Sequence, residues 1–239
     1  MSYKQLLAVQ ILLLNITYAY SCQIFNHPTE ALAIVKPYLP DNPVVLEAGA
    51  YDGTDSIAIS KNWAKATFHA FEPVPELYQK LSKKTKPFAN INTYPFALGD
   101  YTGIAKFYVS EFENQPGIPS ESSSLLKPKE HLIHAPHVVF KREISVPIMT
   151  IDSWAQAYGV DTIDFMWLDM QGYELNALKA SPKIMKTVKA ILTEVEFVEA
   201  YEGQYLFAEV KTWLEEQGFV MIARNFYCDW FGDALFVRK

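Results

Sequence analysis

The sequence is poor in cysteine, with only Cys22 and Cys228 among its 239 residues. It contains no CxxC pair and no cysteine spacing of the zinc-finger kind, which excludes a zinc-finger fold. The two cysteines lie far apart in the sequence. That separation leaves open whether they form one disulfide bridge or remain free thiols.

An excess of positive charge is also missing. The chain has 21 lysines and arginines against 27 aspartates and glutamates, a formal net charge of -6. This balance provides no broad basic surface, so we expect no nucleic acid among its partners. Internal repeats, low-complexity tracts and coiled-coil heptads are absent, and 50% of the residues are apolar. Such a chain is typical of one soluble α/β domain, and nothing in it indicates an oligomeric state.

No apolar run near the N-terminus reaches the roughly 20 residues that a membrane-spanning helix needs. The run from Leu6 to Ala19 follows Lys4, and Ala19 and Ser21 stand just before Cys22. This pattern is typical of a secretory signal peptide. We therefore divide the chain into a signal-peptide-like segment (1–21), a lead-in (22–42) and one domain (43–239). We expect export or membrane tethering without a stable span in the mature chain, and a packed first helix on a cytoplasmic protein is the alternative.

Strand-like apolar runs alternate with helical patterns along the domain. The predicted strands are Val44–Glu47, Thr67–Phe71, Ile91–Ala97, Ile163–Leu168 and Ala190–Val195, with helices at Asp55–Trp63, Pro75–Lys84, Glu174–Ala180 and Phe207–Gln217. This alternation predicts an α/β fold with a mostly parallel sheet covered on both faces. No helix separates Phe219–Ala223 from Ala234–Val237, which predicts an antiparallel hairpin at one edge. Ala105–Val109 and Glu143–Met149 are predicted to form a small added β pair.

A glycine-containing turn follows the first predicted strand. Gly49 and Gly53 form GxxxG, which is neither GxGxxG nor a phosphate-binding GK[ST] loop. Glu47 and Asp52 would repel a pyrophosphate and instead suit a ligand with a positive charge or hydroxyl groups. Glu72 ends the second strand, where an acid can accept hydrogen bonds from ribose hydroxyls. Together these residues indicate an adenosine-containing ligand.

The chain resembles the FkbM family of S-adenosylmethionine-dependent methyltransferases. The resemblance rests on "LEAGAYDG" (46–53), "AFEPVPELYQKL" (70–81), "FALGD" (96–100) and "IDFMWLDMQGYELNAL" (163–178). The family usually has Asn where this chain has Tyr51, and Glu where it has Gln171. The resemblance implies a Rossmann-like class I methyltransferase fold with a seven-stranded sheet whose final strand is antiparallel. It also implies an S-adenosyl-L-methionine site at Glu47, Gly49, Ala50, Asp52, Gly53 and Glu72, with Ala97 and Leu98 near the adenine.

Carboxylates at the ends of later strands are candidates for catalysis. Asp169 is the first candidate, followed by Glu174 and Glu194, because a carboxylate can orient and deprotonate an acceptor hydroxyl. The expected reaction is O-methylation of a glycan or a small metabolite. An exported, non-catalytic binding module on the same fold is the alternative, since export would separate the enzyme from its intracellular cofactor. A nicotinamide-dependent oxidoreductase is a third, more distant alternative.

Two further segments are open to a functional interpretation. His131, His134 and His137 lie in an irregular segment between Glu111 and Arg142, whose length suggests a lid or an acceptor-binding loop. Pro136 breaks the histidine spacing and no acid cluster completes a site, so we expect no metal. The aromatic stretch "RNFYCDWFGD" (224–233) favours a hairpin turn over the core, with sugar stacking as the alternative.

Overall fold

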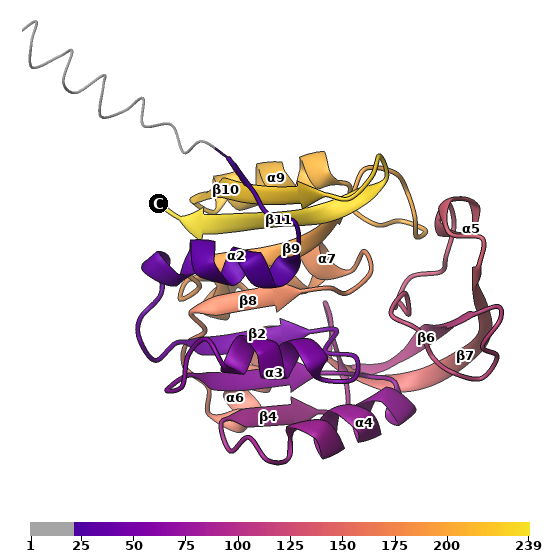
Figure 1. Cartoon of the computed structure of the whole chain (residues 1–239), viewed down its shortest axis with the longest axis horizontal. Coiled ribbons are helices and arrows are strands. Elements are labelled where there is room, and N and C mark those ends of the chain that lie inside the picture. The colour runs from indigo at the N-terminus through magenta and orange to yellow at the C-terminus, as the bar shows by residue number, and fades with distance from the viewer. Residues whose placement is uncertain (1–21) are drawn as a thin grey trace, which may run out of the picture.

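The computed structural model describes residues 22–239 and confirms the α/β architecture (Figure 1). The signal-peptide-like segment lies outside the described residues. One eight-stranded sheet crosses the molecule in the spatial order β1-β10-β11-β9-β8-β2-β3-β4. Its strands are β1 (Gln23–Ile24), β2 (Val44–Ala48), β3 (Thr67–Phe71), β4 (Ile91–Tyr94), β8 (Phe165–Leu168), β9 (Ala190–Glu196), β10 (Phe219–Phe226) and β11 (Phe231–Arg238).

Adjacent strands are parallel except around β11, which runs antiparallel to both β10 and β9. The mostly parallel sheet and its antiparallel last strand are thus confirmed, but two details differ from the prediction. The sheet has eight strands instead of seven, because β1 pairs with Ala223 and Arg224 of β10. The antiparallel strand is also internal, since β11 lies between β10 and β9. Phe25, only 1% exposed, anchors the lead-in beside the sheet.

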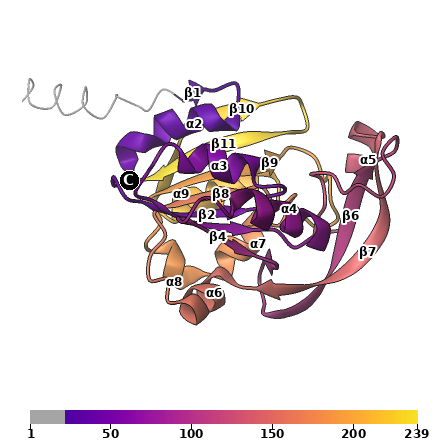
Figure 2. The same cartoon turned by 60° about the horizontal axis from the view of Figure 1, so that its bottom comes forward.

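Alternating side chains along each strand build two hydrophobic layers. Val45 packs on one face and Leu46 on the other, as the two-residue period of a strand requires. Figure 1 shows α2, α3 and α4 in front of the sheet, and Figure 2 shows α6, α8 and α9 on the opposite side. The helices are α2 (Pro28–Val35), α3 (Thr54–Ser60), α4 (Pro75–Thr85), α5 (His131–His134), α6 (Ile151–Tyr158), α7 (Glu174–Lys179), α8 (Pro182–Met185) and α9 (Phe207–Glu216).

A second, three-stranded sheet forms the predicted β insertion. It has the order β5-β7-β6, with strands β5 (Ala97–Leu98), β6 (Gly103–Phe112) and β7 (Val138–Met149). The predicted single strand Ile91–Ala97 is therefore wrong, because it divides between the two sheets. Pro95 stands at the division and has no N–H to continue a ladder. The insertion stands beyond the carboxyl ends of the parallel strands (Figures 1 and 2).

Strand register decides the question of the two cysteines. Gln23 pairs with Ala223, which places Cys22 beside Ile222. Four strand residues, roughly 13 Å, separate Ile222 from the end of β10, and Cys228 lies beyond it. A disulfide needs Cα atoms within about 7 Å, so the cysteines cannot pair within one chain, and both are exposed free thiols. No helix among residues 22–239 is long and apolar enough to span a bilayer.

Candidate active site

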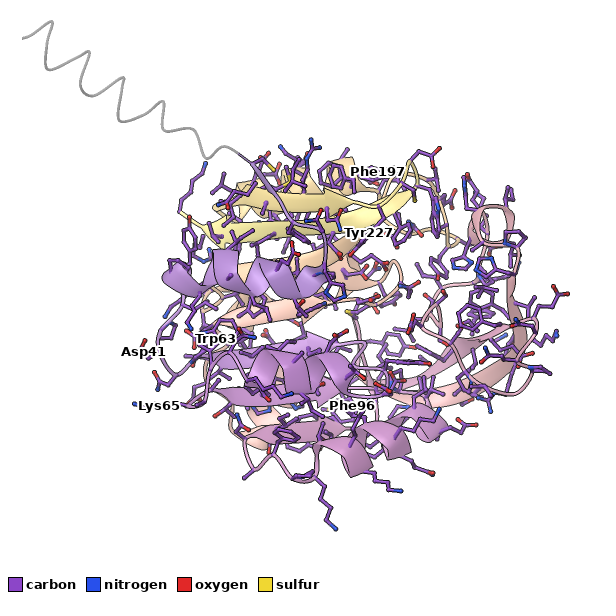
Figure 3. The ribbon with its side chains drawn as sticks, in the orientation of Figure 1. Asp41, Trp63, Lys65, Phe96, Phe197 and Tyr227 are labelled. Carbon is purple, nitrogen blue, oxygen red and sulfur yellow. The ribbon has the colours of Figure 1, made fainter. Side chains whose placement is uncertain are left out.

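A cavity of about 480 Å³ opens where the carboxyl ends of β2, β3 and β8 face the insertion. Figure 3 labels Phe96, one of its lining residues, below these strand ends. Seven of the predicted site residues line the cavity: Gly49, Ala50, Asp52, Glu72, Ala97, Leu98 and Asp169. The other four predicted residues, Glu47, Gly53, Glu174 and Glu194, are not among its lining residues.

The turn after β2 is held tightly by backbone contacts. The amides of Gly49 and Ala50 both donate to the carbonyl oxygen of Phe71, at 3.1 and 2.9 Å. Gly49 has φ +86°, and a Cβ built on it would lie 1.9 Å from the carbonyl oxygen of Asp169. Glycine is therefore needed at position 49, both for its left-handed backbone and for the close approach of β8.

Glu72 presents a rigidly oriented carboxyl group. One oxygen accepts a hydrogen bond from the Val74 amide at 2.7 Å, and the other accepts one from the Tyr51 amide at 3.0 Å. The side chain is only 5% exposed, and burial raises its pKa to about 8. The two amides occupy only one site on each oxygen, so the Glu72 carboxyl can still form hydrogen bonds with a ligand in the cavity, as acceptor when ionised and as donor or acceptor when protonated.

Two of the predicted residues lie behind the turn and stabilise it. Glu47 accepts a hydrogen bond from the Ser56 hydroxyl of α3, and burial raises the pKa of Glu47 to about 8. A Cβ on Gly53 would approach the Leu81 side chain to 2.8 Å, so Gly53 allows α4 to pack against the turn. Asp52 does line the cavity, while its carboxylate accepts from the Thr54 amide and pairs with Lys84.

The three candidate catalytic acids occupy different positions around β8. Asp169 lines the cavity, and burial raises its pKa. Glu174 accepts from the Met170 amide at 2.6 Å and so holds the loop after β8, with its own pKa raised by burial to about 8. Glu194 lies on β9 opposite Asp233, and burial raises its pKa well above the usual range. Asp169 is therefore the one of the three that can meet a ligand in the cavity.

A sequence model of the methyltransferase FkbM domain matches residues 47–221. The chain belongs to the FkbM methyltransferase family. The 2-O-methyltransferase NoeI of Sinorhizobium fredii is 29% identical over 182 residues, covering 74% of this chain and 74% of NoeI. The methyltransferase sdnD of Sordaria araneosa is 24% identical over 206 residues, covering 76% of this chain and 75% of sdnD.

Solved structures support the fold of this FkbM protein. The fibrillarin pre-rRNA processing protein of Methanococcus jannaschii superimposes with a TM-score of 0.51 at 14% identity, over 89% of this chain and 76% of that one. The N-terminal domain of EvdMO1, solved in the presence of SAH and D-fucose, gives 0.50 at 10% identity, over 90% and 83%. At these identities the likeness establishes the Rossmann-like fold alone. The family match identifies this protein as an S-adenosylmethionine-dependent methyltransferase.

The residues around the FkbM cavity fit S-adenosylmethionine. Gly49 and Ala50 line the cavity at the turn, and Phe96 and Leu98 offer apolar surface for a purine. The cavity is lined by five carboxylates, Asp52, Asp55, Glu72, Glu121 and Asp169. Among the described residues that line it, His27 is the single basic side chain, with no lysine or arginine. This charge distribution suits a ligand that carries a sulfonium cation.

Sequence reasoning missed the cavity residues that come from outside the family motifs. Ser120, Glu121, Ser123 and Leu125 of the insertion form the wall opposite the turn, and only the length of that segment hinted at a role. His27 reaches the cavity from the start of α2, and no sequence signal pointed to it.

Two of the three histidines of the insertion, His131 and His134, pack against aromatic rings. His131 is buried against the rings of Phe140, Tyr201 and Trp230, and burial lowers its pKa to about 4. His134 stacks on Trp230 from the β10–β11 connection. Within residues 22–239, no group of histidine, cysteine and acidic side chains is arranged to hold a metal ion.

The buried acids predict a characteristic pH dependence of stability. Glu47, Glu72 and Glu174 have pKa values near 8, raised from 4.5 by burial. Their stabilising contribution is complete below pH 4.5 and is lost as pH rises through 8. His69 and His131 have pKa values lowered from 6.5 to about 4. Their stabilising contribution is complete above pH 6.5 and is lost as pH falls through 4, so it does not change above pH 6.5.

We therefore expect the free energy of unfolding of the cofactor-free protein to fall between pH 6.5 and 9. Urea denaturation across this range measures it. Glu174→Gln keeps an acceptor for the Met170 amide but removes one titrating group, so its decrease should be smaller than in the wild type. A free energy of unfolding that rises over this range would contradict the assignment of buried, protonated acids.

Proposed function

We propose that this enzyme transfers a methyl group to a hydroxyl oxygen of a glycan or a small metabolite. The observation that carries the proposal is Asp169, a partly buried carboxylate at the cavity wall next to the glycine turn. The name of the relative NoeI, a 2-O-methyltransferase, supports oxygen as the acceptor atom. A raised pKa makes Asp169 a stronger base when it is ionised, which suits proton removal from an alcohol.

The cavity residues divide into a cofactor group and an acceptor group. Gly49, Ala50 and Glu72 would hold the methionine and ribose parts, and Ala97 and Leu98 the adenine. When bound, S-adenosylmethionine supplies a methyl group made electrophilic by its sulfonium and leaves as the neutral thioether. Asp169 would orient the acceptor hydroxyl and accept its proton. The insertion wall of Ser120, Glu121 and Ser123 would contact the acceptor and exclude water.

The charges around the cavity restrict the acceptor. Carboxylates at Asp55, Glu121 and Asp169 would repel a phosphate or a sugar acid. A neutral or cationic hydroxyl compound fits better, and the lack of lysine and arginine among the described lining residues supports the expectation of no nucleic-acid substrate.

A methyl-transfer assay with labelled S-adenosylmethionine tests this function. The acceptor panel should contain neutral sugars with free hydroxyls, matched sugar acids and phenols. We expect label in neutral hydroxyl compounds and none in the matched acids. Cofactor binding without transfer to any acceptor would instead support a non-catalytic binding module, and label on nitrogen or sulfur acceptors would contradict O-methylation.

Glu72 provides a separate test of cofactor binding. Glu72→Ala removes the acceptor of two backbone amides and of the expected ribose hydroxyls. Stranding such buried partners costs roughly 1–3 kcal/mol, so affinity for S-adenosylmethionine should fall about 5- to 150-fold. Isothermal titration measures it. Glu76→Gln, an exposed acid on α4 paired with Arg142, is the matched control and should leave affinity unchanged. Equal affinities in both variants would remove Glu72 from the cofactor site.

We also propose that residues 1–21 are a cleaved targeting segment. The described fold begins with β1 immediately after this segment, so cleavage before Cys22 would leave the sheet and buried Phe25 intact. N-terminal sequencing of protein from its native host should therefore yield a chain that starts at Cys22. Soluble cytoplasmic protein that starts at Met1 or Ser2 would contradict export.

A further inference from the structure

We propose that Gln171 is a positioning residue whose side-chain amide holds the carboxylates of Asp169 and Glu194 in place and keeps Asp169 ready to accept the acceptor's proton. This inference rests on the proposed role of Asp169. It concerns a residue outside the cavity lining, in the loop between β8 and α7.

The hydrogen bonds of Gln171 use its side-chain amide fully. Nε2 donates to Asp169 Oδ1 at 2.7 Å and to Glu194 Oε2 at 2.6 Å. Oε1 accepts from the Tyr201 hydroxyl at 2.7 Å. An amide nitrogen has two hydrogens, so each carboxylate receives one of them. A single side chain thus joins the end of β8 to β9.

The orientation of this amide is set by its neighbours. If it were flipped, Oε1 would face two carboxylate oxygens at hydrogen-bonding distance, and Nε2 would face the Tyr201 hydroxyl. The ionised carboxylate of Asp169 can only accept, so it favours an N–H group on its side, whereas the Tyr201 hydroxyl, which also lies 2.9 Å from the Ser122 carbonyl oxygen, can donate or accept. Asp169 therefore keeps the N–H groups of Gln171 directed at the acids, and Tyr201 contacts the opposite end of the same amide.

The backbone of Gln171 is held in an uncommon conformation. Its φ is +53°, a left-handed conformation that side-chain-bearing residues rarely adopt. The Ser124 hydroxyl of the insertion donates to the Gln171 carbonyl oxygen at 2.8 Å and helps to hold this conformation. Strained backbone of this kind persists where the surroundings fix it, often beside functional groups. Ser124 also joins the candidate acceptor wall to the acids.

The electrostatic surroundings explain why an amide stands here. The titratable groups that interact with Asp169 or Glu194 come from the surrounding elements: Glu174 of α7, Glu196 of β9, Asp233 of β11, Asp55 of α3, Glu47 of β2, Glu72 after β3, Glu121 of the insertion and Tyr201. All of them are neutral or negative, and burial raises the pKa of Asp169 further. Hydrogen bonds from Gln171 and, to a smaller extent, from Glu194 lower that pKa. Gln171 is thus a donor that favours the ionised, proton-accepting form of Asp169 without adding charge.

Methyl transfer requires the ionised form of Asp169, because this form accepts the proton of the acceptor hydroxyl. The acceptor oxygen forms its bond to the methyl carbon, the electron pair of the broken carbon–sulfur bond goes to sulfur, and the hydroxyl proton passes to Asp169. Gln171 takes no part in these bond changes. Its N–H groups stay with the carboxylates throughout, so it acts on the rate through Asp169 alone.

Gln171→Glu is the main test, because it keeps the shape and replaces a two-hydrogen donor with a carboxyl. The acidic limb of the kcat–pH profile should move upward by about one pH unit, a tenfold loss of kcat on that limb. The acceptor KM should change much less than kcat. Gln204→Glu is the matched control, since Gln204 is similarly buried nearby but bonds only to the backbone of Val198 and Tyr201. An equal shift in the control, or none in Gln171→Glu, would overturn the inference.

A second readout does not depend on activity. Proteins carrying ¹³C-labelled aspartate should show Asp169, assigned with Asp169→Asn, titrating at higher pH in Gln171→Glu than in wild type. Tyr201→Phe, which keeps Gln171 but removes the hydroxyl that contacts its Oε1, loosens the amide, should shift Asp169 in the same direction and serves if Gln171→Glu does not fold. An unchanged Asp169 titration in the folded variant would reject the inference. A shifted titration in an enzyme that methylates no acceptor would instead reject the proposed function.

Discussion

Asp169→Asn should lower the turnover of methyl transfer by about a hundredfold or more, the usual scale for losing a general base. The substitution keeps the shape of the side chain and removes its ability to take a proton. Asp169 lines the cavity beside the Gly49 turn, where burial raises its pKa and so strengthens its ionised form as a base. Affinity for S-adenosylmethionine should change only a few-fold, because asparagine still presents an oxygen to the cavity.

The measurement pairs a cofactor titration with a labelled-methyl assay on the same preparations. Asp161→Asn removes one negative charge from the exposed segment before β8 and serves as the control, with turnover expected to match wild type. Equal turnover in Asp169→Asn and wild type would reject catalysis by Asp169. Loss of cofactor binding without a separate effect on rate would reassign Asp169 to the cofactor pocket.

The predicted residues that the structure brings to the cavity are those whose position follows from local pattern. Glu72 and Asp169 end apolar strands, and parallel strands bring their carboxyl ends to one edge. The glycine turn follows from the same rule. The position of Glu47 away from the cavity could also have been predicted, because it follows from the two-residue period of the strand. Glu47 lies two residues after Val45, so its side chain points to the α3 side of the sheet and meets Ser56 instead of the cavity.

Other features depend on contacts between distant parts of the chain. β1 has only two residues, too few for any periodicity, and its pairing with β10 spans about two hundred residues. The proposed role of Gln171 depends on its contacts with Glu194 and Tyr201, and the sequence alone does not show that these residues lie beside it. It stands where the family usually has glutamate, so a carboxylate is missing from this position. The hydrogen bonds instead show an amide between two acids, where its two donors are needed.

Gly49→Ala should reduce both stability and cofactor binding strongly, because the new methyl group has no room. Its Cβ would lie 1.9 Å from the carbonyl oxygen of Asp169, and main-chain atoms cannot move aside as a flexible side chain can. The ends of β2 and β8 would have to separate, which weakens the bond from the Asp169 amide to the Ala48 carbonyl. Asp169 itself would move with β8.

Gly159→Ala isolates the backbone part of this effect. Gly159 also has a left-handed φ of +67°, but nothing lies within 4 Å of its Cβ position. Forcing alanine into that conformation costs about 1–2 kcal/mol. Gly49→Ala bears a similar cost and adds overpacking of about 1–3 kcal/mol, which together correspond to a fall in Tm of roughly 4–20 °C for a chain of this size. Thermal unfolding should therefore give a lower Tm for Gly49→Ala than for Gly159→Ala.

Titration should show normal S-adenosylmethionine binding in Gly159→Ala and little or none in Gly49→Ala. If the two variants instead melted together and bound the cofactor equally well, the close approach of β8 to the turn could not be what shapes the cofactor site.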